Sequence, residues 1–161
     1  IRSPFRFEGL IREAIHQLKY RNLRALAVPL AQLLRDYLAA SPVPGGVLVP
    51  VPLHQKRLRE RGYNQSSLLA RELGKLINLP VVDDCLIRQR HAPPQARTST
   101  VDERKNNVAG AFVCRDRRLQ DKQVLLIDDV STSGATLDAC AGALKVAGAA
   151  SVWGLVLAKE I

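Results

Sequence analysis

The stretch that decides the fold reads Val124-Leu-Leu-Ile-Asp-Asp-Val-Ser-Thr-Ser-Gly-Ala-Thr-Leu137. Its four leading aliphatic residues predict a strand buried on both faces, because a strand with one exposed face would alternate apolar with polar residues. If that strand simply continued, Asp128 and Asp129 would point to opposite faces. For both to serve one ligand, the chain must leave the sheet at about this point. An apolar-periodic run from Leu137 to Ala147 predicts a helix after the loop.

The order of strand, acidic pair, hydroxyl-rich loop and helix start suits a sugar phosphate. Backbone N–H groups and the positive end of the helix dipole favour a phosphate, and carboxylates just upstream can accept hydrogen bonds from sugar hydroxyls. An ordinary helix N-cap uses the same residue types but needs only one of them. The predicted ligand-binding residues are Asp128, Asp129, Val130, Ser131, Thr132, Ser133, Gly134, Ala135 and Thr136. The G-x-x-x-x-G-K-[ST] motif does not occur, which excludes a P-loop nucleoside triphosphatase.

This stretch resembles the phosphoribosyl pyrophosphate (PRPP) loop of type I phosphoribosyltransferases. Further matches, over nearly the whole chain, resemble the ComF/GntX family, which is associated with competence and DNA utilisation. They are Pro50-Val-Pro-Leu-His54, Arg57, Arg61-Gly-Tyr-Asn-Gln65, Gln95, Glu103-Arg104, Asn107 and Ala111-Phe112. The resemblance implies a phosphoribosyltransferase-like protein that binds magnesium-PRPP, transfers the phosphoribosyl group to a nitrogen nucleophile and releases pyrophosphate.

The resemblance also implies catalytic roles. Asp128 and Asp129 are expected to hold the ribose hydroxyls and to steady positive charge at the anomeric carbon. Arg57 and Arg104 are expected to act on the diphosphate beside them. Magnesium is expected on the substrate's own oxygens and water, with no metal site built by the protein, because Mg²⁺ keeps much of its hydration.

A dense basic cluster follows the predicted buried strand Val47–Val51. In a phosphoribosyltransferase this loop contacts pyrophosphate, and its positive charges would stabilise the charge that builds on the leaving group. A solvated helix face and a contact with a nucleic-acid backbone are the alternatives. Arg57 and Arg61 lie one turn apart if the segment is helical. The predicted pyrophosphate-binding residues are Pro52, Leu53, Lys56, Arg57, Arg59 and Arg61.

A long polar span runs from Gln89 to Asn107 and contains few core-forming residues. Loops of this length in compact domains are usually functional lids or disordered segments. Its position matches the flexible loop that closes over PRPP in type I enzymes, where closure would exclude water from the reaction. The residues expected to act there are Gln95, Arg97, Arg104 and Asn107.

The rest of the chain alternates helical and strand patterns. This alternation predicts an α/β fold of the type I phosphoribosyltransferase kind, with a mostly parallel central sheet and helices on both faces. Residues 1–40 are expected to form an N-terminal helical cap beside a core of residues 41–161 in the same domain. The expected helices are 7–18, 23–40 and 65–79, with Asn64 either as the cap of the last one or as a ligand contact, and Gly148 is expected to end the helix that follows the loop. The further strands are 80–88, 111–114 and 151–158, with Trp153 in the core, and the three cysteines are expected to be reduced core thiols.

Composition limits the partners. The net charge of +9 favours anionic partners such as pyrophosphate, nucleotides or nucleic acid. The family resemblance implies PRPP or another phosphorylated small molecule as the ligand, with single-stranded DNA or DNA-uptake proteins as further candidate partners. The three cysteines are far apart without a C-x-x-C pair, so neither a disulfide framework nor a zinc site is predicted. The family commonly carries a cysteine-rich segment before the transferase part, and its absence here, with no Met in a chain that begins at Ile1, suggests a fragment. No signal peptide or membrane helix is predicted, so a cytoplasmic location is expected.

Two other functions stay open. One is a nucleic-acid-handling accessory of DNA uptake, in which the chain contacts DNA or DNA-uptake proteins without turnover. The other is a PRPP-sensing regulator, because a binding loop cannot by itself distinguish a sensor from an enzyme. The acceptor is not indicated, since residues 2–40 show no recognisable base-recognition pattern.

Overall fold

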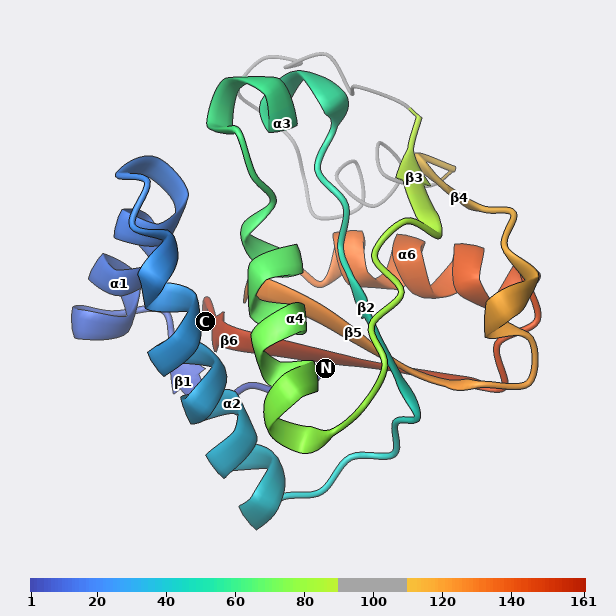
Figure 1. The fold of residues 1–161 in the computed structure, drawn as a ribbon, viewed down its shortest axis with the longest axis horizontal. Coiled ribbons are helices and arrows are strands. Elements are labelled where there is room, and N and C mark those ends of the chain that lie inside the picture. The colour runs from blue at the N-terminus through green and yellow to red at the C-terminus, as the bar shows by residue number, and fades with distance from the viewer. Residues whose placement is uncertain (90–109) are drawn as a thin grey trace.

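A wholly parallel four-stranded sheet forms the centre of the molecule in the computed structural model, which describes residues 1–89 and 110–161 (Figure 1). The strand order is β1-β6-β5-β2. All of β2 and the aliphatic part of β5 are buried, as expected for a parallel sheet covered on both faces. The predicted α/β fold is confirmed. The strands are β1 (Phe5–Arg6), β2 (Val47–Pro50), β5 (Gln123–Ser131) and β6 (Ser151–Lys159).

Helices cover the two faces of this sheet unequally. Alternate residues of β5 enter two separate cores: Leu125 and Ile127 pack with the N-terminal helices and α4, whereas Val124 and Leu126 pack with α6. This division follows from the alternation of side chains along a strand. The helices are α1 (Gly9–Tyr20), α2 (Ala27–Ala40) and α4 (Gln65–Ile77) on one face and α6 (Ala135–Val146) on the other.

The N-terminal helices belong to the same hydrophobic core as the sheet. Leu30 and Leu34 of α2 are buried with Leu48 of β2 and Leu155 of β6. The short 3₁₀ helix η1 (Arg24–Leu26) precedes α2, so Pro29 lies in the first turn, where a missing N–H is tolerated. The expected helix over 7–18 starts and ends two residues later, because the chain before it first pairs with β6.

The strand predicted over residues 80–88 is wrong in its extent. Only Val81 bridges β2, and the chain then leaves the central sheet. Strand β3 (Leu86–Arg88) pairs instead with β4 (Phe112–Cys114), in antiparallel orientation.

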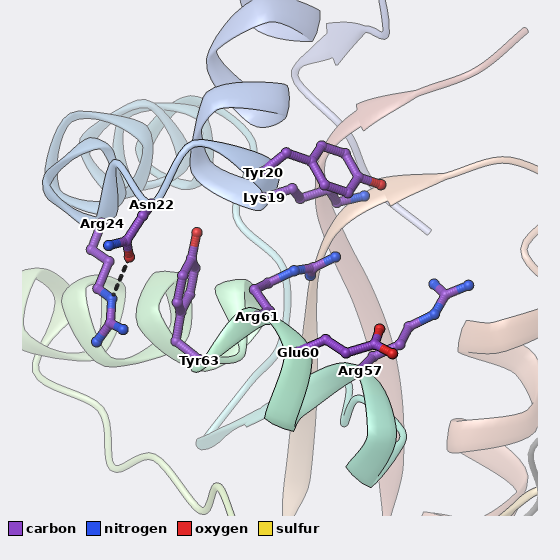
Figure 2. A pocket seen from close by; sticks show the side chains of 8 residues that line it. All are labelled: Lys19, Tyr20, Asn22, Arg24, Arg57, Glu60, Arg61 and Tyr63. Carbon is purple, nitrogen blue, oxygen red and sulfur yellow. Dashed lines mark hydrogen bonds between the residues drawn. The ribbon is translucent and has the colours of Figure 1, made fainter.

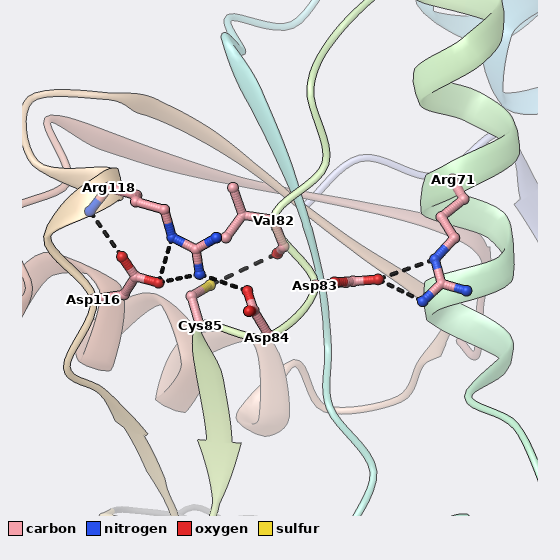
Figure 3. Close-up of polar contacts among 7 residues, drawn as sticks. All are labelled: Arg71, Val82, Asp83, Asp84, Cys85, Asp116 and Arg118. Carbon is pink, nitrogen blue, oxygen red and sulfur yellow. Dashed lines mark hydrogen bonds and ion pairs between the residues drawn. The ribbon is translucent and has the colours of Figure 1, made fainter.

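Two exposed carboxylates explain this departure (Figure 3). Asp83 pairs with Arg71 of α4 at 2.5 Å, and Asp84 pairs with Arg118 at 2.5 Å. Arg118 lies in the short 3₁₀ helix η2 (Arg117–Leu119) and also pairs with Asp116. Its hydrogen bonds to the Asp116 carboxyl lower the pKa of that carboxyl. Charged side chains are rarely buried in a central strand that is covered on both faces, so the segment with Asp83 and Asp84 turns toward solvent.

Several element ends follow the sequence prediction. Asn64 caps α4 by accepting a hydrogen bond from the Ser66 N–H at 3.0 Å. Gly148, with φ of 97°, ends α6 in the left-handed conformation. The three cysteines are buried and free, as expected of reduced core thiols.

Trp153 lies at the edge of the hydrophobic core and packs against it. Its side chain is only partly buried, and the Arg2 guanidinium lies over its ring at 5.8 Å. The neighbouring edge strand β1 is two residues long, and an isolated bridge between Arg2 and Leu155 borders β6 near Trp153. In the part of the chain that the structure describes, no helix is long and apolar enough to cross a membrane.

Candidate functional site

The candidate site lies at the carboxyl edge of the parallel sheet, where β2 and β5 end (Figure 1). This is the edge at which ligands bind in open α/β sheets. Helix α3 (Gln55–Arg61) follows β2 and brings the basic cluster to this edge, and the loop 132–134 follows β5 and leads into α6.

The acidic pair lies within β5, contrary to the expectation that the chain leaves the sheet there. The strand continues to Ser131, because Val130 and Ser131 still pair with β6. The two carboxylates therefore leave the strand on opposite sides and have different partners, and a ligand that contacts both must reach over the carboxyl edge of the sheet. Asp128 Oδ1 accepts a hydrogen bond from Ser66 Oγ at 2.8 Å.

Asp129 faces the N-terminal helices. Its Oδ2 atom lies 3.1 Å from the Nζ of Lys19, the residue before the last one of α1. The Asp129 residue is only 2% exposed. Lys19 is thus the counter-charge of this carboxylate.

Burial is the main influence on the ionisation of Asp128. It raises the pKa of the carboxyl, and the neighbouring Asp129 carboxylate raises it further, to about 7. The Ser66 hydrogen bond and the Lys19 ammonium oppose this shift without cancelling it. Hydroxyl donors or a cation brought by a ligand would favour the ionised form.

The loop after β5 presents hydrogen-bond donors. Gly134 adopts φ of 83° and has no side chain with which to cap α6. Ser133 Oγ accepts from the Ala135 N–H at 3.3 Å, whereas the N–H groups of Thr136 and Leu137 have no hydrogen-bond partner among the described residues. The Ser131 residue is 4% exposed, and its hydroxyl has no partner in the described chain either. Such a set of donors suits an anion.

The basic cluster divides between two surfaces once α3 has formed. Arg57 and Arg61 lie one turn apart on α3, as predicted for a helical segment. Both line one cavity, whereas Lys56 and Arg59 do not line it. Pro52 and Leu53 line a second, neighbouring cavity of about 500 Å³.

The cavity shared by Arg57 and Arg61 has a volume of about 590 Å³ and lies between two separate parts of the chain (Figure 2). We call it the arginine–tyrosine cavity. Arg24 lies over the Tyr63 ring at 4.5 Å, and Arg61 lies over the Tyr20 ring at 5.5 Å. Its lining residues are Lys19, Tyr20, Asn22, Arg24, Arg57, Glu60, Arg61 and Tyr63.

Arg88, at the end of β3, is a candidate that sequence analysis did not identify. Its Nε is buried without a hydrogen-bond partner among the described residues, and its guanidinium lies 5.5 Å over the Phe112 ring. Burial lowers the pKa of Arg88, and the nearby positive charge of Arg57 lowers it further. Two neighbouring guanidinium groups would be stabilised by a bound anion.

The loop residues expected over PRPP lie outside the described residues. They are Gln95, Arg97, Arg104 and Asn107.

Comparison with known proteins places the chain in a family, although no family model matches the sequence. DNA utilization protein YhgH of Escherichia coli K12 is 34% identical over 86% of this chain and 62% of its own length. Competence protein F of Haemophilus influenzae is 33% identical over 69% of this chain and 50% of its own length. Competence protein ComFC of Bacillus subtilis is 27% identical over 99% of this chain and 64% of its own length. This chain belongs to the ComF family. It spans 50% to 64% of the length of these relatives.

Solved structures agree on the fold of this ComF-family chain. The glutamine PRPP amidotransferase of B. subtilis, in complex with ADP and GMP, matches with a TM-score of 0.53 and 19% identity, over 81% of this chain and 26% of that one. An allosteric regulatory enzyme of purine biosynthesis matches with a TM-score of 0.52, 19% identity and the same coverage. At this identity the likeness concerns the type I phosphoribosyltransferase fold alone.

Proposed function

We propose that this ComF-family chain binds magnesium-PRPP at the carboxyl edge of its sheet and transfers the phosphoribosyl group to a nitrogen nucleophile. One observation carries the proposal: a carboxylate pair, buried at Asp129 and partly buried at Asp128, lies just before a loop whose donors lack partners among the described residues. Asp128 and Asp129 would accept hydrogen bonds from the ribose hydroxyls. The N–H groups of Thr136 and Leu137 and the Ser131 hydroxyl would bind the 5'-phosphate.

The diphosphate would lie against the arginines that follow β2 and end β3. Arg57 has no hydrogen-bond or ion-pair partner among the described residues, and Arg88 adds a second guanidinium beside it. Bound Mg²⁺ would neutralise part of the diphosphate charge. No cluster of three or more acidic, histidine or cysteine ligands occurs among the described residues, and Mg²⁺ typically needs only one or two carboxylates besides substrate oxygens and water. Asp128 and Asp129 fit that requirement.

The proposed step is a substitution at the anomeric carbon. The nitrogen lone pair forms the new C–N bond, the C–O bond to the diphosphate breaks, and its electron pair leaves with pyrophosphate. The proton lost by the nitrogen passes to pyrophosphate or solvent. The two carboxylates would stabilise positive charge on the sugar, and the arginines would stabilise the leaving group.

Isothermal calorimetry with PRPP and Mg²⁺ tests this function. We expect the Asp128→Asn/Asp129→Asn protein to lose binding. A control is Asp36→Asn, which changes an exposed aspartate of α2 that lines neither of the cavities at the site and pairs with Arg35. We expect the control to bind like the unchanged protein. A folded, unchanged protein that binds no PRPP would contradict the proposal.

A second candidate is a DNA-handling accessory without turnover. It is favoured by the names of the relatives, which refer to competence and DNA utilisation, and by the net charge of +9. Fluorescence anisotropy with labelled oligo(dT) should then give an affinity that falls steeply with salt, because phosphate contacts release counterions. A PRPP-sensing regulator would instead bind PRPP and release no pyrophosphate with any acceptor.

A further inference from the structure

Resting on that proposed function, we propose that the arginine–tyrosine cavity binds the acceptor, and that the acceptor is a planar aromatic or heteroaromatic acid with a negative charge. The cavity lies next to the acidic pair, because Lys19 lines it and also contacts Asp129 at 3.1 Å. A ligand placed there would be close to the sugar that Asp129 is proposed to hold. Its volume of about 590 Å³ suits a small molecule.

The rings and guanidinium groups favour a planar ligand. Tyr20 and Tyr63 come from opposite sides of the cavity, and each carries an arginine over its ring. The Tyr63 ring is held in place because its hydroxyl donates to the Leu18 carbonyl oxygen. Tyr20 is 63% exposed although its ring contacts the His16 ring at 4.8 Å and the Arg61 guanidinium at 5.5 Å, so a ligand can stack on the part of the ring that these two leave open. Stacking on tyrosine or on a guanidinium plane requires a flat π system.

The charge favours an anionic ligand. Four of the lining side chains are cations, and the single acid, Glu60, forms no ion pair among the described residues. Arg24 donates to the neutral Asn22 side chain at 3.0 Å, and Arg61 donates to the neutral Gln65 side chain. Their charges are therefore not balanced by an acidic partner in the described chain. A carboxylate on the ligand would supply that balance, whereas a neutral nucleobase would not.

The arginines that line the cavity differ in orientation, which indicates two different binding roles. In Figure 2 the Arg57 guanidinium points away from Tyr63 and Arg24, and the Tyr63 ring lies between Arg24 and Arg61. Arg57 is the residue whose charge also reaches Arg88. We therefore assign Arg57 to the diphosphate and assign Arg24 and Arg61 to the acid group of the acceptor.

A matched pair of probes tests the charge and the ring together. Pyridine-3-carboxylate and pyridine-3-carboxamide have the same shape and differ in charge. Titrations followed by saturation-transfer NMR, with magnesium-PRPP present, should show at least tenfold tighter binding of the acid. Arg24→Gln should weaken binding of the acid about tenfold, and Tyr20→Leu about threefold. Arg117→Gln removes an equal charge from η2, outside the cavity, and should change nothing.

The outcomes separate this inference from the proposed function. PRPP binding without any preference for the acid would overturn the inference and leave the proposed function intact. Acid binding that depends on Arg24 in a protein that binds no PRPP would support the cavity and contradict PRPP binding. Displacement of the acid by oligo(dT), with oligonucleotide binding that itself depends on Arg24, would assign the cavity to nucleic acid and overturn the inference. Thermal unfolding of each variant would show that it is folded.

Discussion

Lys19 Nζ lies 3.1 Å from Asp129 Oδ2 and so joins the end of α1 to the acidic pair of β5. The carboxylate side chain is 3% exposed and the lysine side chain 21%, so the pair is largely shielded from water. In the proposed complex the ribose hydroxyls would share or replace this lysine. The contact therefore links the stability of the protein to the site proposed for the sugar.

Lys19→Met should destabilise the ligand-free protein by roughly 2–3 kcal/mol, because it leaves a buried carboxylate without its counter-charge. Urea denaturation measures this free energy of unfolding. Combining it with Asp129→Asn should recover part of the loss, with a coupling energy of about 1–2 kcal/mol in the double-mutant cycle. Two additive substitutions would show that the pair contributes nothing to stability.

Asp128 should make the ligand-free protein less stable at alkaline pH. Its raised pKa means that the folded state holds this proton more tightly than the unfolded state does. The resulting stability is complete below the ordinary carboxyl pKa and is lost as the pH rises through about 7. Asp128→Asn mimics the protonated form and keeps an oxygen to accept from Ser66. Its stabilising effect should therefore grow by about 1–3 kcal/mol between about pH 5 and pH 8.

Urea denaturation at both pH values checks this, with Asp36→Asn as the control. Asp36 is an exposed carboxylate of α2 whose side chain is 64% accessible. Its substitution should leave the pH dependence unchanged. An Asp128→Asn protein with the same pH dependence as the unchanged protein would contradict the role given to Asp128.

Local patterns in the sequence predicted what local interactions determine. The aliphatic run before Asp128 is a buried strand, Asn64 caps α4, and Gly148 ends α6. Each of these features depends on residues close in sequence, such as a cap that bonds an amide two residues away. The place of the acidic pair at the carboxyl edge of the sheet was predictable for the same reason.

Features set by distant partners were not predictable. Val130 and Ser131 stay in the sheet because β6 pairs with them, although the sequence around them resembles a loop. The segment at Asp83 and Asp84 leaves the sheet for arginines on other elements. The arginine–tyrosine cavity forms between η1 and α3, which are far apart in the sequence. Arg24 lies over the Tyr63 ring only because the folded chain brings these two segments together.

Gly134 should be required for the conformation of the loop 132–134, and Gly142 in the helix that follows offers a matched control. Gly134 has φ of +83°, and an added Cβ would lie 2.9 Å from Ile1 Cδ1. Gly134→Ala should lower the free energy of unfolding by about 1 kcal/mol and weaken PRPP binding severalfold. Gly142 lies within α6 with nothing within 4 Å of an added Cβ, so Gly142→Ala should stabilise by roughly 0.5–1 kcal/mol.

Calorimetry with magnesium-PRPP and urea denaturation distinguish the two glycine variants. Equal effects of both substitutions on PRPP affinity would show that the loop conformation at Gly134 does not matter for binding.

Arg88 should serve the ligand more than the fold. Its buried Nε has no partner among the described residues, so Arg88→Met removes no hydrogen bond seen there and replaces a partly buried charge with an apolar chain. We expect the free energy of unfolding to change by less than about 1 kcal/mol or to rise. The affinity for magnesium-PRPP should fall about tenfold, or about 1.4 kcal/mol, because the diphosphate loses a guanidinium.

Arg88→Lys keeps the charge without the planar fork and should therefore weaken PRPP binding less than Arg88→Met does. Arg35→Met removes a guanidinium from α2, where it pairs with Asp36 in solvent, and should leave PRPP affinity unchanged. Calorimetry on the three variants, with urea denaturation of each, separates the two roles. The opposite result would be an Arg88→Met protein that is destabilised as strongly as by the loss of a core side chain, while its folded fraction binds PRPP normally. Arg88 would then be a structural residue whose side chain packs on Phe112, and the diphosphate would depend on Arg57 and not on Arg88.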